Sequence, residues 1–67
     1  MKLLSQREVD IIRHAAQGFT AKEIAKLTGL EYRTVESYVI TIRKKLSARN
    51  ITHAVFLAIQ HEMLMAS

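Results

Sequence analysis

Residues 32–46 of this chain carry the side chains whose types and spacing best suit a chemical task. Four apolar residues recur there at spacings of four, three and four, which predicts a helix with one buried stripe. They are Val35, Val39, Ile42 and Leu46. At about 3.6 residues per turn, a second set falls on or beside the opposite face of that helix. Its members are Arg33, Glu36, Ser37, Ile40, Thr41 and Lys44. Because most of these groups donate or accept hydrogen bonds, the predicted chemistry is recognition of a polar surface.

The major groove of duplex DNA is one polar surface that accepts a single helix. In the groove, Arg33 can bond a guanine edge and Glu36 can accept from cytosine N4. Ser37 can hydrogen-bond to either of these bases. Ile40, an apolar residue on a polar face, can contact a thymine methyl. With Thr41 on the flank, these residues are the predicted base contacts. In the alternative interpretation, Arg33 and Glu36 form only a solvated ion pair of little energetic weight.

Cations gather at the end of the same predicted helix, where Arg43, Lys44 and Lys45 are followed by Arg49. These charges suit the negative end of the helix dipole, so a solvated face would also explain them. Beside a groove-bound helix they would lie along phosphates, and polar residues at helix starts would add to them. The predicted phosphate contacts from this argument are Thr20, Lys22, Thr34, Lys44, Lys45 and Arg49.

Local signals define the helices that would hold this face in place. Ser5 with Glu8, and Thr20 with Glu23, have the spacing of capping boxes. Gly18 and Gly29 are the only glycines and mark helix ends. We therefore expect helices at about 6–17, 21–28 and 32–46, and a fourth from a cap at Asn50 to about residue 62. Glu31 is a poor cap for the third helix.

Alternating polar and apolar residues, which are typical of strands, are absent from the sequence. Two short helices separated by a few residues that include a glycine predict a helix-turn-helix unit at about 21–46. The expected fold is all-α: a compact four-helix domain that spans residues 1–67 and contains this unit.

The composition of the chain limits the kinds of function that it can have. The net charge of +4 and the pI of about 9.9 favour a polyanionic partner. The chain has no cysteine, and its three histidines, which we expect to be exposed, do not cluster, so we predict no enzyme activity, no metal and no cofactor. The longest apolar run, residues 54–59, is far shorter than the roughly 20 residues that cross a bilayer, so we expect a soluble, cytoplasmic protein without a membrane partner.

The fourth predicted helix is apolar on all sides over residues 54–59, whereas one core covers only one side. We expect its core-facing residues to be Ile51, Val55, Ala58 and Ile59. The remaining apolar residues, Phe56, Leu57 and Leu64, are the predicted dimer interface. The alternative is a small core that is shared with no other chain.

Several segments resemble the LuxR-type helix-turn-helix domain of bacterial transcriptional regulators. They are Leu4-Ser5-Gln6-Arg7-Glu8, Gly18-Phe19-Thr20-Ala21-Lys22-Glu23-Ile24-Ala25, Thr34-Val35, Lys45-Leu46 and Ala54-Val55, in the family's order and spacing. The resemblance implies a DNA-bound homodimer at the bacterial nucleoid, with the third helix in the major groove, the fourth in the dimer contact, and RNA polymerase as a possible partner. It also implies base contacts just after Thr34-Val35, at Glu36, Ser37 and Ile40.

This sequence departs from the family pattern at three positions. Glu31 replaces a common serine cap, and Glu36 stands where a basic residue is frequent, so two carboxylates would oppose phosphate. Tyr38 stands where histidine is common; we count it among the phosphate contacts, although its hydroxyl can instead pack against the domain. Two alternatives stay open. One is the promoter-reading domain of a sigma factor, whose helix-turn-helix is similar in its Leu-Ser-x-Arg-Glu and Thr-Val segments. The other is a protein-interaction module that has lost DNA binding, with Glu31 and Glu36 as traces of the loss.

Overall fold

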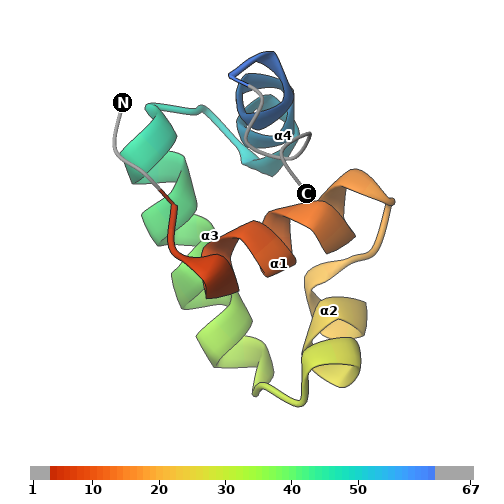
Figure 1. Cartoon of the computed structure of the whole chain (residues 1–67). Coiled ribbons are helices and arrows are strands. Elements are labelled where there is room, and N and C mark those ends of the chain that lie inside the picture. Colours follow the sequence, from red (N-terminus) through yellow and green to blue (C-terminus); the bar gives the residue numbers. More distant parts are fainter. Residues whose placement is uncertain (1–3, 62–67) are drawn as a thin grey trace.

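Four helices make up the regular structure of residues 4–61 (Figure 1). The computed structural model describes residues 4–61. In chain order the helices are α1 (Gln6–Ala16), α2 (Ala21–Thr28), α3 (Tyr32–Leu46) and α4 (Ile51–Gln60). The all-α prediction is confirmed, and the first three helices lie within one residue of their predicted bounds. The fourth ends at Gln60, before the predicted end near residue 62.

Side-chain caps explain where three of these helices begin. The Ser5 hydroxyl accepts from the Glu8 amide at 3.2 Å, and Oε1 of Glu8 accepts from the Ser5 amide at 2.7 Å. Thr20 and Glu23 repeat this capping box at 3.2 and 2.8 Å. At the start of α4, Asn50 Oδ1 accepts from the His53 amide at 2.8 Å. Gly29 ends α2 at a φ of 75°, a conformation that glycine adopts at little cost.

α1 lies in the middle of the molecule, with α3 on one side and α2 and α4 toward its other edges (Figure 1). α1 and α3 each pack against all three other helices, while α2 and α4 do not pack against each other. The fully buried apolar residues come from every helix: Ile11, Ile12, Ile24, Val35, Ile42, Leu46, Ala54 and Ala58. Burial of each large aliphatic side chain contributes about 1.5–3 kcal/mol. α1 therefore fixes the orientation of α3.

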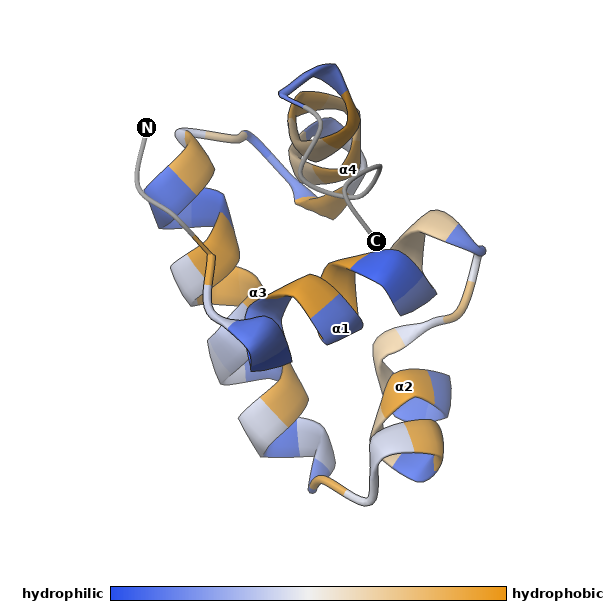
Figure 2. Ribbon diagram, viewed as in Figure 1, coloured by the Kyte–Doolittle hydropathy of each residue, from blue (hydrophilic) through white to orange (hydrophobic). Residues whose placement is uncertain are grey.

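The predicted orientation of α4 was partly wrong. Ala54 and Ala58 are 0% exposed and form the centre of its buried face, with Ile51 and Val55 half-buried beside them. Leu57, predicted to face outward, packs against the core, whereas Ile59, predicted to face inward, is 46% exposed. Figure 2 shows α4 as largely apolar, and over residues 54–59 no polar side chain indicates which side of the helix packs inward. The two alanines decide it, because their small side chains let the helix approach α1 closely.

The start of α3 has no side-chain cap, as predicted from Glu31. Its N-cap backbone is extended, at φ −70° and ψ 151°, which is the conformation from which a serine hydroxyl can accept an amide hydrogen bond. We expect Glu31→Ser to raise the free energy of unfolding by about 0.5–1 kcal/mol. Urea unfolding followed by circular dichroism measures this change. As the matched control, Thr20→Ala should lower stability by about 1 kcal/mol; no gain in the serine variant would show that the α3 amides are already well solvated.

Candidate nucleic-acid interface

The side of α3 that faces away from α1 is open to solvent. Val35 and Ile42 are 0% exposed on the inner side, while Ile40 is 48% exposed. Every predicted base-contact residue is exposed on this side. We call these residues, Arg33, Glu36, Ser37, Ile40 and Thr41, the outward face of α3. Because no other part of residues 4–61 covers this face, it is available to a ligand.

Arg33 and Glu36 do not form the predicted alternative ion pair. Within residues 4–61 the only salt bridge joins Lys45 and Glu8. The Glu36 carboxylate instead raises the pKa of the Tyr32 phenol one turn earlier, first as a hydrogen-bond acceptor and then through its charge. The Arg33 guanidinium is therefore not neutralised by Glu36 and can bond to a ligand.

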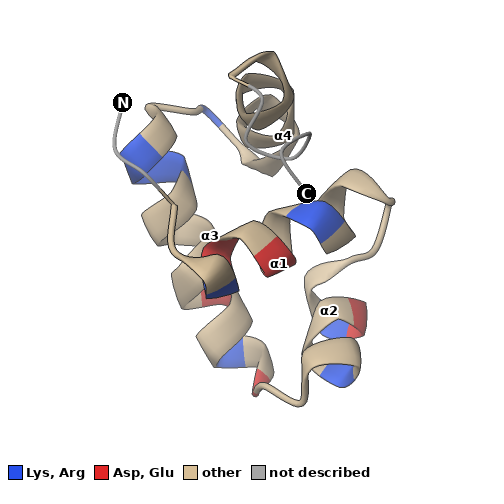
Figure 3. Ribbon diagram, in the orientation of Figure 1, with Lys and Arg blue, Asp and Glu red and all other residues tan. Residues whose placement is uncertain are grey.

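Most of the predicted phosphate contacts are exposed around the outward face. They are Thr20, Lys22, Thr34, Lys44 and Arg49. Basic residues gather at the C-terminal end of α3 and continue into the connection to α4 (Figure 3). Tyr38 differs from the others, because it is half-buried and packs against the core. Of the two roles left open for Tyr38, the structure favours packing.

Lys45 has a structural partner that the sequence did not predict. Its Nζ lies 2.8 Å from Oε1 of Glu8, a carboxylate that is only 3% exposed. Burial opposes ionisation of Glu8, but the Lys45 hydrogen bond, the Ser5 amide and hydroxyl, and the Lys45 charge together hold the pKa of Glu8 below its usual 4.5. Lys45 therefore ties the end of α3 to the start of α1, and its charge is already compensated.

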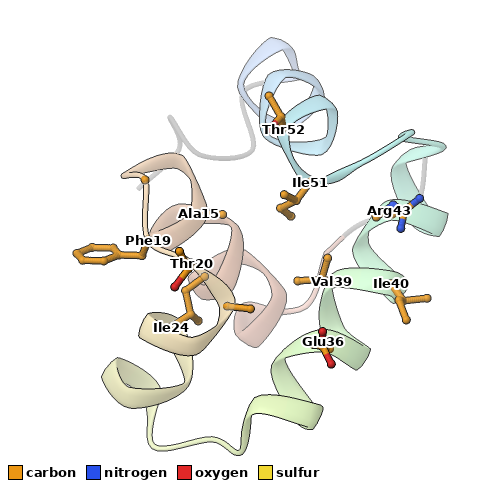
Figure 4. A pocket seen from close by; sticks show the side chains of 12 residues that line it. Ala15, Phe19, Thr20, Ile24, Glu36, Val39, Ile40, Arg43, Ile51 and Thr52 are labelled. Atoms are coloured by element: carbon orange, nitrogen blue, oxygen red, sulfur yellow. The ribbon is translucent and has the colours of Figure 1, made fainter.

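A groove of about 570 Å³ adjoins the outward face (Figure 4). Its walls come from the end of α1, the start of α2, the middle of α3 and the start of α4. Phe19, Ile24 and Ile51 make them largely apolar, and Glu36 and Arg43 add charge on the α3 side. Ile40 borders both the groove and the outward face, so a ligand on α3 would meet this apolar edge.

Two of the three histidines are less exposed than predicted, whereas His61 is exposed. His14 and His53 are half-buried, because His14 packs edge-on against Phe19 at 6.0 Å and His53 Nδ1 accepts from the Arg49 amide at 3.1 Å. Within residues 4–61 no group of three histidine, cysteine or acidic side chains is arranged to hold a metal ion. Among the same residues, no helix is long and apolar enough to cross a membrane.

The predicted dimer residues have different surroundings. Phe56 is 59% exposed, Leu57 is half-buried, and Leu64 lies outside the described residues. Ile59, at 46% exposure, is the other large exposed apolar residue on α4. The exposed apolar surface of α4 therefore centres on Phe56 and Ile59.

The fold and the outward face together define a helix-turn-helix domain, with α2 and α3 as its two helices. Residues 2–58 match the family described as bacterial regulatory proteins, luxR family. The chain therefore belongs to the LuxR family, which confirms the resemblance and supports a role in DNA-binding transcription regulation. Domains of this type are generally non-enzymatic.

Curated relatives are similar over most of the chain. The transcriptional activator protein BjaR1 of Bradyrhizobium diazoefficiens is 43% identical over 61 residues, which cover 91% of this chain and 25% of that protein. The response regulator protein VraR of Staphylococcus aureus is 33% identical over 63 residues, which cover 94% of this chain and 30% of that protein. The chain thus spans less than a third of the length of these relatives.

Proposed function

We propose that this domain binds duplex DNA in a sequence-dependent way, with the outward face of α3 in the major groove. The observation that carries this proposal is the open, mixed polar face opposite the buried Val35 and Ile42. Arg33 then bonds guanine, Glu36 accepts from cytosine, and Ser37 hydrogen-bonds a base edge. Ile40 contacts a thymine methyl, and Thr41 borders the same bases.

The DNA backbone is held by exposed cations and hydroxyl groups on either side of α3. Lys22 lies in the first turn of α2, while Lys44 and Arg49 lie at the far end of α3 and beyond it. Thr20 and Thr34 contribute hydroxyl groups at helix starts, where backbone amides also favour phosphate. Lys45 and Tyr38 are not in this set, because one is paired with Glu8 and the other packs on the core.

Two copies are needed to read a full operator. The longest dimension of the domain is 27 Å, which is less than the roughly 34–36 Å between successive major-groove half-sites. One domain therefore reaches one half-site, and a second copy occupies the next. The exposed apolar surface around Phe56 and Ile59 of α4 is the proposed contact between copies. RNA polymerase is the further partner, at promoters in the bacterial nucleoid.

Selection of bound sites from a pool of random duplexes tests this function. We expect two half-sites about one helical turn apart. Ser37→Ala and Ile40→Ala should each lose about 1–3 kcal/mol at particular base pairs, because each removes one base contact. Gln17→Ala is the control, since Gln17 is exposed at the end of α1 and not on α3. If both α3 variants selected the wild-type sequence, α3 would not be the reading element.

A protein-interaction module is the second candidate function. The observation that favours it is the pair of exposed carboxylates, Glu31 and Glu36, at the start of α3. Both would approach phosphates, and the charge repulsion would weaken binding to any duplex. The salt dependence of duplex binding separates the two candidates. The sigma-factor alternative loses support because the chain matches the LuxR family over residues 2–58.

A further inference from the structure

The connection between α3 and α4 holds one residue by both of its backbone polar groups. The Arg49 carbonyl accepts from Nη2 of Arg43 at 2.7 Å. The Arg49 amide donates to Nδ1 of His53 at 3.1 Å. The two side chains come from different helices, α3 and α4, and meet at a residue that is itself exposed. The backbone of Arg49 is therefore fixed while its side chain stays free to contact a ligand.

The rest of the connection is fixed in the same way. The amide of Ser47, which has a φ of 55°, donates to carbonyls in the last turn of α3. The Ala48 amide donates to the Arg43 carbonyl at 2.8 Å, so Arg43 holds the connection through its backbone as well as its side chain. Asn50 caps α4 through the His53 amide. Each of the four residues between α3 and α4 thus makes a hydrogen bond, although only Ala48 among them is half-buried.

The side chain of Arg43 has one buried hydrogen-bond donor that is not satisfied by any other described residue. Its side chain is half-buried and lines the groove, toward the C-terminal end of α3 (Figure 4). Its Nε is buried without a hydrogen-bond partner, and within residues 4–61 no carboxylate forms a salt bridge with it. A buried donor without an acceptor destabilises a fold, so packing alone does not explain a guanidinium here. The hydrogen bond from Arg43 to the Arg49 carbonyl does explain the presence of the guanidinium.

We propose that Arg43 and His53 are positioning residues that direct the Arg49 side chain toward a DNA phosphate. This inference rests on the proposed function, because it assigns a task to residues outside the outward face of α3. A cation on a fixed backbone loses less conformational freedom on binding than one on a mobile loop. The two side chains therefore raise the affinity of the domain for DNA without contacting DNA themselves.

A double-mutant cycle on a duplex with a single half-site tests the inference, because one domain is then measured. We expect Arg49→Ala to make the log–log salt slope shallower by about 0.9, and to weaken binding roughly eightfold near 0.1 M salt. Arg43→Met, which keeps the stem but has no donor, should also weaken binding, because the Arg49 side chain then loses more conformational freedom when it contacts a phosphate. The double variant should be no weaker than Arg49→Ala, since both changes act on the same phosphate contact. Arg7→Ala, an exposed cation on α1, should leave the slope unchanged.

His53→Phe repeats the test from the other helix. It keeps an aromatic ring and the backbone bond to Asn50 but removes the acceptor for the Arg49 amide. It should again weaken binding and add nothing to the effect of Arg49→Ala. This variant also decides the matter if Arg43→Met does not fold, which thermal unfolding of each variant will show.

Three results would overturn the inference. Additive losses in the Arg43–Arg49 cycle would mean that Arg43 contacts a phosphate directly. Lower thermal stability with unchanged affinity for the duplex would mean that the connection is only structural. A wild-type domain without salt-dependent duplex binding would remove the proposed function and this inference with it, whereas the first two results leave the proposed function intact.

Discussion

Raising the salt concentration from about 50 to about 200 mM is expected to weaken binding to a duplex with two half-sites about a thousandfold. Each domain offers three exposed, unpaired cations to phosphates: Lys22, Lys44 and Arg49. Two domains therefore release about six condensed counterions, which corresponds to a log–log slope near −5. Fluorescence anisotropy of a labelled duplex measures this slope directly.

Lys45, which is paired with Glu8, is the matched control for the contribution of Lys44 to this salt dependence. Lys44→Ala should flatten the slope, by about 0.9 for each domain, because it removes a free cation. Lys45 is bound to Glu8, so its ammonium contributes little to phosphate binding. Lys45→Met should therefore change the slope less than Lys44→Ala does, although it lowers stability. A wild-type slope near zero would instead favour the protein-interaction module.

Glu8→Ala is expected to lower the free energy of unfolding by about 2.5–4 kcal/mol, from about 1 kcal/mol for the capping box and about 1.5–3 kcal/mol for a hydrogen bond between charged groups. This is a large share of the total stability, which is only about 3–10 kcal/mol for a chain of this size. Urea unfolding followed by circular dichroism measures the loss. Glu23→Ala is the matched control, because Glu23 completes the other capping box without a lysine partner, so its loss should be near 1 kcal/mol. Equal losses in the two variants would show that the Glu8–Lys45 pair contributes nothing.

The same carboxylate makes stability depend on pH. Since folding lowers the pKa of Glu8 below 4.5, the folded state prefers the ionised form. That contribution is fully present above about pH 4.5 and is lost as the pH falls through the lower pKa of the folded state. The stability difference between wild type and Glu8→Gln should therefore shrink over this acid range. A difference that stays constant from neutral pH to below the folded-state pKa would contradict a role for the ionised carboxylate.

The features that were predictable from sequence are those set by neighbours along the chain. Ser5 and Glu8 are three residues apart, as are Thr20 and Glu23, so both capping boxes were visible as spacing. The outward face of α3 was also visible, because its buried stripe repeats with the helical period.

The features that could not be predicted from the sequence depend on contacts between segments that are far apart along the chain. Glu8 and Lys45 lie 37 positions apart, and the capping pattern at Glu8 looks the same as the one at Glu23, which has no lysine partner. α4 offers no polar face over residues 54–59, so the sequence did not determine which side packs inward. The bond from Arg43 to the Arg49 carbonyl depends on the path of the connection, which follows from how α3 and α4 pack.

A map of backbone amide shifts, recorded as the domain is titrated with its selected duplex, tests whether the outward face of α3 binds DNA. We expect the largest shifts on the outward face of α3, at Arg33, Glu36, Ser37 and Ile40, with smaller shifts near Lys22 and Arg49. Shifts confined to the exposed surface of α4, with the outward face of α3 unchanged, would contradict this expectation.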